Sequence, residues 1–198
     1  MNILCTICAR GGSKGLPNKN VKNLLGKPLI GWTIEQALGC REIDSVYIST
    51  DSDLIAETAK KFGAKIVFKR PDLLASDNAG KWEVWQHALK KCEEINNIRY
   101  DTYIDLDCTC PLKESEDISE ALKIFKSKSV DCIFSVCESR KNPYFNMIEY
   151  DKNKLVISKK PNKKVVCRQN APKVYDHVAS IYIMKANYLR ESDGLLSG

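Results

Sequence analysis

A short apolar run followed at once by a glycine-rich basic loop constrains this chain more than any other feature. Residues 2–8 read Asn-Ile-Leu-Cys-Thr-Ile-Cys, which predicts a short buried strand. Residues 9–20 read Ala-Arg-Gly-Gly-Ser-Lys-Gly-Leu-Pro-Asn-Lys-Asn and cannot continue that strand. The three glycines between positions 11 and 15 let the backbone take a positive φ and come close to a bound group. We therefore expect a binding loop at the end of the first strand.

The chemistry of this loop indicates that it holds phosphates. Consecutive amide N–H groups in such a turn form a concave anion site, and Arg10, Lys14 and Lys19 add cations that would neutralise a triphosphate. The loop matches neither the P-loop nor the dinucleotide Gly-x-Gly-x-x-Gly pattern. The alternative is a surface turn whose lysines are merely solvated. A position at the carboxyl end of a strand in an α/β sheet favours binding.

Composition places the chain among ordinary globular proteins. Its 198 residues suit one domain, with 28% charged and 43% apolar residues. The net charge of +6 is spread along the chain, which favours an anionic substrate over a nucleic acid. No apolar stretch approaches membrane-spanning length, so no membrane partner is expected.

The cysteines indicate a reducing compartment and no zinc site. We expect the first residues to lead straight into a strand and to carry no cleavable signal, and the nine cysteines are interpreted as the reduced thiols of a cytoplasmic protein. Cys5 and Cys8 form a Cys-x-x-Cys, but their positions along a strand predict side chains on opposite faces.

Strand and helix patterns alternate along the chain. This order predicts an α/β fold with a mainly parallel, Rossmann-like sheet flanked by helices on both faces. The predicted helices are residues 29–38, 54–62, 81–94 and 115–125, and the further strands are residues 45–50, 65–69, 103–107, 131–137 and 179–184. Residues 141–175 carry short polar segments, three prolines and paired lysines, which indicate an insertion or substrate lid within a single domain 1–198.

Two carboxylates stand on the strand Ile104-Asp105-Leu106-Asp107. Because they alternate with apolar residues, both project to the same side of the sheet. Buried carboxylates require a partner, and hard oxygen ligands of this kind suit Mg²⁺ bridged to substrate phosphates. The alternative is that one aspartate caps the following turn and the other pairs with a lysine.

Two arginines and one histidine are further candidate site residues, each considered by itself because it belongs to no longer motif. Arg70, just after the third strand, could hold a phosphate or a base, or it could bond the carbonyls of its own loop. Arg168 could hold a substrate carboxylate through two parallel hydrogen bonds. His177 stands alone beside a strand, which is typical of a structural residue.

Taken in order, these segments resemble the acylneuraminate cytidylyltransferase (CMP-sialic acid synthetase) family over the whole chain. The blocks that carry the resemblance are residues 9–20, 49–52, 69–71 with 74–77, 109–112, and 168–169. Two further segments, residues 104–107 and 142–146, resemble the branch that handles legionaminic-type nonulosonic acids.

The resemblance implies a fold and a reaction. The fold is that of the nucleotide-diphospho-sugar transferases (GT-A-like) with a small insertion. The reaction transfers CMP from CTP to a nine-carbon 2-keto sugar acid and releases pyrophosphate, with Mg²⁺ (or Mn²⁺), in a homodimer. Two alternatives stay open: a cytidylyltransferase for another sugar, such as 3-deoxy-octulosonate or a sugar 1-phosphate, and a non-catalytic nucleotide-binding homologue.

The resemblance also implies roles for individual residues. The triphosphate would be held, and catalysis assisted, by Arg10, Lys14 and Lys19. The nucleotide site as a whole would comprise Ala9, Arg10, Gly11, Gly12, Ser13, Lys14, Lys19, Asn20, Arg70, Ala75, Ser76 and Ala79. The sugar would contact Asp107, Thr109, Asn142, Tyr144, Phe145, Arg168 and Gln169. The metal would be bound by Asp105 and Asp107.

The chain departs from the family pattern at two places. Many members that act on sialic acid carry Gln-Pro-Thr-Ser-Pro-Leu-Arg, where residues 107–113 here read Asp-Cys-Thr-Cys-Pro-Leu-Lys. An aspartate in place of glutamine indicates a sugar other than N-acetylneuraminate. The family also carries a late Asp-x-Asp that completes its metal site, whereas Ser192-Asp193-Gly194 leads into a loop. We therefore expect a chain cut short of its last elements.

Overall fold

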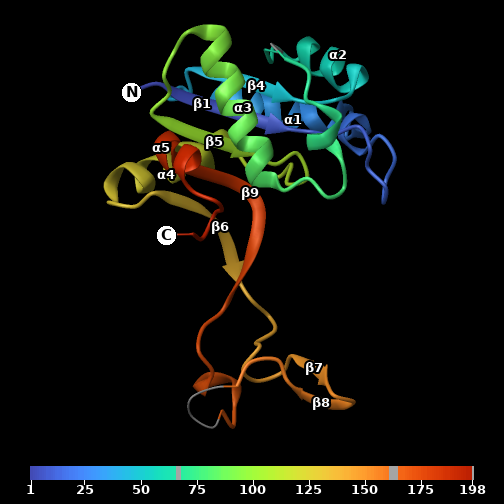
Figure 1. Cartoon of the computed structure of the whole chain (residues 1–198), viewed down its shortest axis with the longest axis vertical. Helices are drawn as coiled ribbons and strands as arrows, with labels where there is room; N and C mark the ends of the chain where they lie inside the picture. Colours follow the sequence, from blue (N-terminus) through green and yellow to red (C-terminus); the bar gives the residue numbers. More distant parts are fainter. Residues whose placement is uncertain (66–67, 161–164, 198) are drawn as a thin grey trace. The chain divides into compact units, whose positions relative to one another are not determined.

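A computed structural model describes residues 1–65, 68–160 and 165–197 of the chain (Figure 1). It divides into two compact units, one formed by residues 1–134 with 179–198 and the other by residues 135–178. The insertion expected at residues 141–175 lies inside the second unit.

The main sheet carries the first unit and has the strand order β4-β1-β5-β9-β6. Its members are β1 (Ile3–Cys8), β4 (Ser45–Ser49), β5 (Thr102–Leu106), β6 (Cys132–Glu138) and β9 (Tyr175–Lys185). Strand β1 pairs in parallel with both β4 and β5, while β9 pairs antiparallel with β5. The expected α/β architecture is therefore present, and the carboxyl ends of β4, β1 and β5 meet at one edge of the sheet, where ligands of such folds bind.

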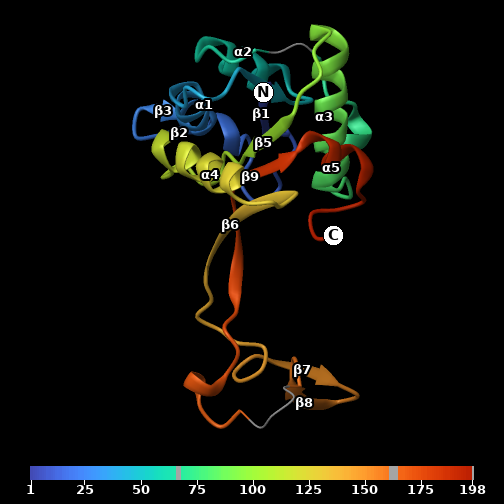
Figure 2. The same ribbon diagram turned by 90° about the vertical axis from the view of Figure 1, so that its left-hand side faces the viewer.

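Helices cover both faces of the sheet, as Figure 2 shows. One apolar cluster joins the sheet to α1 (Leu29–Gly39), α2 (Asp53–Lys61) and α4 (Ser115–Ser127). The opposite cluster joins it to α3 (Lys81–Asn96) and the short α5 (Ala186–Glu191). Cys5 belongs to the first cluster and Cys8 packs against the second, which confirms that they point to opposite faces.

Local sequence signals set the helix ends. The Ser52 hydroxyl accepts a hydrogen bond from the Ile55 N–H and caps α2. Glu114 and Asp117 form a capping box at α4. Each helix predicted from the sequence is present, with ends displaced by at most two residues. Among the described residues no helix is long and apolar enough to cross a membrane.

Of the strand expected at residues 65–69, the described part confirms the parallel pairing of Lys65 and shows no strand at residues 68–69. Lys65 forms an isolated bridge with Tyr47, residues 66–67 lie outside the described part, and residues 68–69 are not in a strand. The Arg70 N–H donates to the Thr50 carbonyl, directly after β4, and Pro71 can donate no hydrogen bond.

Smaller elements fill the connections. A first hairpin pairs β2 (Asn23–Leu24) with β3 (Lys27–Pro28), and single 3₁₀ turns lie at Lys19–Val21, Asp72–Ala75 and Arg168–Asn170. In the second unit, β7 (Ile148–Asp151) pairs antiparallel with β8 (Lys154–Ile157). The turn between these two strands places Lys152 at φ 46° and Asn153 at φ 68°, as a two-residue hairpin loop requires.

Candidate active site

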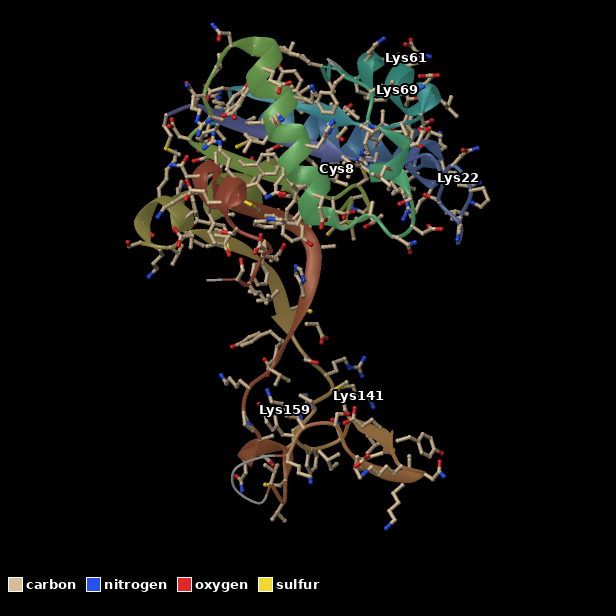
Figure 3. The ribbon with its side chains drawn as sticks, viewed as in Figure 1. Cys8, Lys22, Lys61, Lys69, Lys141 and Lys159 are labelled. Carbon is tan, nitrogen blue, oxygen red and sulfur yellow. The ribbon has the colours of Figure 1, made fainter. Side chains whose placement is uncertain are left out.

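A cavity of about 590 Å³ opens at the carboxyl ends of β1 and β5. Cys8, labelled in Figure 3, ends β1 and forms part of the wall. The lining comprises Cys8, Arg10, Ser13, Lys14, Gly15, Leu16, Lys19, Asn20, Asp77, Asp107, Cys108 and Thr109. The structure thus brings the three predicted loop cations and the predicted metal and sugar residues after β5 into one cavity.

The glycine-rich loop is fixed at its base. The Gly11 N–H donates to Asp51 Oδ1 at 2.9 Å, and the buried Asn20 amide donates to the Arg10 carbonyl at 3.1 Å. The Ser13 N–H donates back to the Gly11 carbonyl at 2.9 Å. Two amides that were expected to bind an anion are therefore already engaged within the protein.

The expected positive φ at the loop glycines is wrong. The described glycines with positive φ are Gly26 and Gly63, and in the loop region the left-handed residue is Asn18, at φ 54°. Gly11 has little room for a side chain, since a Cβ there would lie 3.0 Å from Ser52 Cβ. A Cβ at Gly12 would meet nothing within 4 Å, which leaves open space beside the loop.

Asp77 gathers two of the loop cations. Arg10 Nη2 lies 2.9 Å from Asp77 Oδ1, and Lys14 forms an ion pair with the other oxygen. Arg10 Nη1 also donates to the Ser76 carbonyl at 2.8 Å. The hydrogen bond from Lys14, with the charges of Lys14 and Arg10, lowers the pKa of Asp77. The sequence analysis did not select Asp77, although it ends the block at residues 74–77 that carried the resemblance.

Arg70 lies against the end of β4 instead of in the cavity wall. Its buried guanidinium donates to Ser49 Oγ at 3.0 Å and to the Ser49 carbonyl. The Ala9 N–H donates to the same Ser49 carbonyl at 3.0 Å. Two residues predicted to hold the cytidine therefore meet at Ser49. The Ala79 N–H donates to the Ser76 carbonyl, which folds the predicted loop of residues 75–79 back on itself.

The two aspartates of the β5 strand share one lysine. Lys81 Nζ lies 3.1 Å from Asp105 Oδ2 and 3.1 Å from Asp107 Oδ2, which confirms that both carboxylates project to one side of the sheet. Asp107 Oδ1 accepts the Thr109 N–H at 2.9 Å and the Thr109 hydroxyl at 2.6 Å. Both parts of the alternative interpretation, a turn cap and a lysine pair, are thus present in the structure.

These ion pairs fix the charge of the group. Burial lowers the pKa of Lys81, but the charges of Asp105 and Asp107 outweigh burial and raise it well above its usual value. Burial raises the pKa of Asp107. The charge of Lys81 and the hydrogen bonds from Thr109 have the opposite and larger effect, so the pKa of Asp107 lies below its usual value. Lys81 is therefore an ammonium and Asp107 a carboxylate at neutral pH.

Sequence reasoning missed Lys81 as a site residue. A buried carboxylate requires a cation, but the chain holds 31 lysines and arginines and nothing in the spacing selects one of them. The usable signal is its place as the first residue of α3, separated by three residues from the block at residues 74–77.

Comparison with known proteins agrees with this geometry. A family model described as Cytidylyltransferase matches residues 4–194. The chain belongs to the cytidylyltransferase family. Among its relatives, "CMP-N,N'-diacetyllegionaminic acid synthase" of Campylobacter jejuni is 45% identical over 98% of this chain and 81% of its own length. "Post-translational flagellin modification protein B" of Campylobacter coli is 44% identical with the same coverage. "N-acylneuraminate cytidylyltransferase" of Streptococcus agalactiae is 32% identical over 96% of this chain and 45% of its own length.

Solved structures show the same fold at low identity. The structure of CMP:2-keto-3-deoxy-manno-octonic acid synthetase complexed with CTP superposes with a TM-score of 0.70 at 19% identity, covering 96% of this chain and 76% of that one. The 4-diphosphocytidyl-2C-methyl-D-erythritol synthase of Anaerococcus prevotii has a TM-score of 0.63 at 13% identity, covering 100% of this chain and 80% of that one.

The metal expected in this cytidylyltransferase fits one of the two aspartates. Asp107 lines the cavity and faces the loop cations, whereas the side chain of Asp105 is 1% exposed and lies outside the lining. In the described part of the chain, no three His, Cys, Asp or Glu side chains group as metal ligands. One carboxylate with substrate phosphates is a common way for proteins to hold Mg²⁺.

The second unit of the cytidylyltransferase has a cavity of its own, of about 320 Å³. Asn142, Arg168 and Gln169, three predicted sugar residues, line it. Tyr144 and Phe145 lie outside the lining but belong to the same turn, since the Tyr144 N–H donates to Asn142 Oδ1 and the Phe145 N–H to the Asn142 carbonyl.

Proposed function

We propose that this cytidylyltransferase transfers CMP from CTP to a nonulosonic acid of the legionaminic type and releases pyrophosphate. The observation that carries the proposal is the cavity at the ends of β1 and β5, which Arg10, Lys14 and Lys19 line together with Asp107. The name of the relative at 45% identity, a CMP-N,N'-diacetyllegionaminic acid synthase, points to the same class of sugar.

The chemistry follows from charge and position. The anomeric hydroxyl of the sugar acid attacks the α-phosphorus of CTP and gives its proton to solvent. The bond between the α-phosphorus and the α,β-bridging oxygen breaks, and pyrophosphate leaves with that oxygen. Arg10, Lys14 and Lys19 neutralise the triphosphate and the charge that develops on the leaving group. Ala9, Arg70 and residues 75–79 would hold the cytidine. The protein thus contributes orientation and electrostatics, without a covalent intermediate.

Asp107 would hold Mg²⁺ (or Mn²⁺) in this cavity. When bound, the metal would supply positive charge to the phosphate oxygens. Thr109 supports this role because it fixes Asp107 Oδ1 through both its N–H and its hydroxyl.

The sugar acid would be recognised by residues of the second unit. Arg168 and Gln169 lie on one short 3₁₀ turn and line the cavity of that unit with Asn142. A guanidinium can bind the sugar carboxylate through two parallel hydrogen bonds.

We also propose that the enzyme is a homodimer in the cytoplasm. Apolar side chains of the β7–β8 hairpin are exposed, Ile148 by 60%, Tyr150 by 78% and Leu155 by 58%, and a second copy could cover them. All nine cysteines are free, which is typical of a reducing compartment. Sedimentation equilibrium tests the dimer, and a mass of one chain at micromolar concentration would contradict it.

A second candidate substrate is a 3-deoxy-octulosonic acid. The observation that favours it is the likeness to the CMP:2-keto-3-deoxy-manno-octonic acid synthetase complexed with CTP, at a TM-score of 0.70. That likeness concerns the fold, whereas the sequence relatives point to nonulosonic acids, so we rank it second.

A substrate panel tests the proposal. Pyrophosphate release is measured with CTP, Mg²⁺ and, in turn, N,N'-diacetyllegionaminic acid, pseudaminic acid, N-acetylneuraminic acid and 3-deoxy-manno-octulosonic acid. We expect the highest kcat/KM with the legionaminic acid. The highest value with the octulosonic acid would favour the second candidate. CTP binding without pyrophosphate release in the presence of any of these sugars would indicate a non-catalytic homologue.

A further inference from the structure

The carboxylates of Asp105 and Asp107 are arranged as two ligands of one metal ion would be, but the ammonium of a lysine lies between them. Asp105 and Asp107 project to the same side of the sheet at the end of β5. The space that a divalent ion would share is taken by Lys81, whose Nζ lies 3.1 Å from an oxygen of each.

The ammonium of Lys81 is held from several sides. It lies 4.3 Å from the ring centre of Tyr182 and 5.2 Å from that of Trp85, two aromatic side chains that pack against each other. Cation–π contacts of this kind stabilise a desolvated charge. Lys81 begins α3, the helix that carries Trp85 and covers this face of the sheet. Its position therefore does not depend on a ligand in the cavity.

Asp105 is committed to Lys81. Its side chain is 1% exposed, and its Oδ1 accepts a hydrogen bond from the Thr6 hydroxyl at 3.3 Å. Its Oδ2 has no hydrogen-bond partner among the described residues and is balanced by the ion pair with Lys81. A buried charge that loses its only counter-ion is strongly destabilising. Asp107 differs, because it lines the cavity.

We propose that Lys81 is a positioning residue that occupies the place of a divalent cation between Asp105 and Asp107, which leaves Asp107 as the one carboxylate of this pair that binds the metal. The proposal rests on the proposed function, since the metal is taken from it. It removes Asp105 from the metal ligands expected from the sequence and gives Asp105 the task of holding Lys81.

A matched set of variants changes the net charge of Asp105, Asp107 and Lys81 in defined steps. The native trio of two carboxylates and one ammonium carries a net charge of −1. The double variant Lys81→Met/Asp105→Asn keeps that charge but leaves Asp107 alone. Lys81→Met alone frees a carboxylate pair, and Asp105→Asn alone removes the buried charge while the lysine stays. Lys90→Met, on the exposed face of the same helix, serves as the control.

The test is Mn²⁺ binding, measured by electron paramagnetic resonance on each folded variant without nucleotide. We expect Asp105→Asn and the double variant to bind Mn²⁺ within about twofold of the native protein, because each retains one cavity carboxylate. Lys81→Met should bind about tenfold more tightly, because two carboxylates then share the ion. Lys90→Met should match the native protein. Thermal melts show which variants are folded.

Two outcomes would overturn the proposal. One is a fall of tenfold or more in Mn²⁺ affinity for Asp105→Asn, which would make Asp105 a ligand. The other is a folded Lys81→Met that binds no more Mn²⁺ than the native protein. If Lys81→Met does not fold, Asp105→Asn decides alone. Because Mn²⁺ binding needs no turnover, these results are independent of the substrate panel, whose failure would contradict the proposed function and not this inference.

Discussion

The two units of the molecule differ in how their candidate site residues are supported. In the first unit, an apolar cluster lies on each face of the sheet, and the cavity stands at the ends of strands that are themselves buried. In the second unit, the structure describes residues 135–160 and 165–178, and none of these residues is buried. A cavity on a packed sheet can be formed before the ligand arrives, whereas one built on exposed turns gains order from its ligand or from another chain.

This difference suggests a division of labour that experiments can break. If the first unit holds CTP and the second holds the sugar acid, substitutions in one should change the kinetics of one substrate. A substitution that weakens both substrates equally would contradict the division.

The largest effect is expected at Arg10. Arg10→Ala should lower kcat/KM about a hundredfold or more, because it removes a cation where charge builds on the leaving pyrophosphate. The measurement is pyrophosphate release, with circular dichroism to confirm the fold. Lys22→Ala is the matched control, since Lys22, labelled in Figure 3, is exposed and lies outside the cavity lining. Near-native kcat/KM in folded Arg10→Ala would refute the assignment.

The next effect is expected in the second unit. Arg168→Ala should raise the KM for the sugar acid about tenfold while the KM for CTP stays within about twofold, because a charge-assisted bidentate contact to a carboxylate is lost. Lys154→Ala, on the exposed hairpin strand β8, should change neither value. An equal rise in both KM values for Arg168→Ala would break the comparison between the units.

A pair of glycine variants separates structure from binding within the loop. Gly12→Val should weaken CTP binding about tenfold by blocking the approach of phosphate to the backbone. It should leave the melting temperature unchanged, since a Cβ there meets nothing within 4 Å. Gly11→Ala should lower the melting temperature, because its Cβ would lie 3.0 Å from Ser52 Cβ. Calorimetry with CTP and thermal melts decide, and unchanged CTP affinity in Gly12→Val would show that the loop does not hold phosphate.

The smallest effect is expected at Thr109. Thr109→Val keeps the backbone N–H bond to Asp107 Oδ1 but removes the hydroxyl bond at 2.6 Å. Loss of one such bond, worth about 1 kcal/mol, should raise the Mg²⁺ concentration for half-maximal rate about fivefold. An Mg²⁺ profile identical to that of the native enzyme would remove Thr109 from the support of Asp107.

The same contrast explains what the sequence could and could not predict. Helices such as α2 and α4 have strong caps and periodic apolar faces, so their positions followed from local pattern. The β7–β8 hairpin was not predicted. Lys152-Asn153 is a weaker turn signal than Asn-Gly, and no residue of β7 or β8 is fully buried, so the two strands lack a clear apolar face.

Within the site, the contacts between segments far apart in the chain could not be predicted from local sequence pattern. The loop cations and Asp107 were predicted, because they follow strands that end at one edge of the sheet. The pairing of Arg10 with Asp77 joins residues far apart in the chain, as does that of Lys81 with Asp105. Such pairs depend on how the helix and loop dock on the sheet, and propensity and spacing do not encode that choice.

The central claim, that CMP is transferred by attack on the α-phosphate of CTP, is tested most directly by following one oxygen. The enzyme is given N,N'-diacetyllegionaminic acid and CTP that carries ¹⁸O in the bridge between the α- and β-phosphates. The masses of both products are then measured by mass spectrometry. The account predicts a CMP-sugar without label and pyrophosphate that carries all of it. Label retained in the nucleotide product, or the absence of any CMP-sugar, would contradict the account.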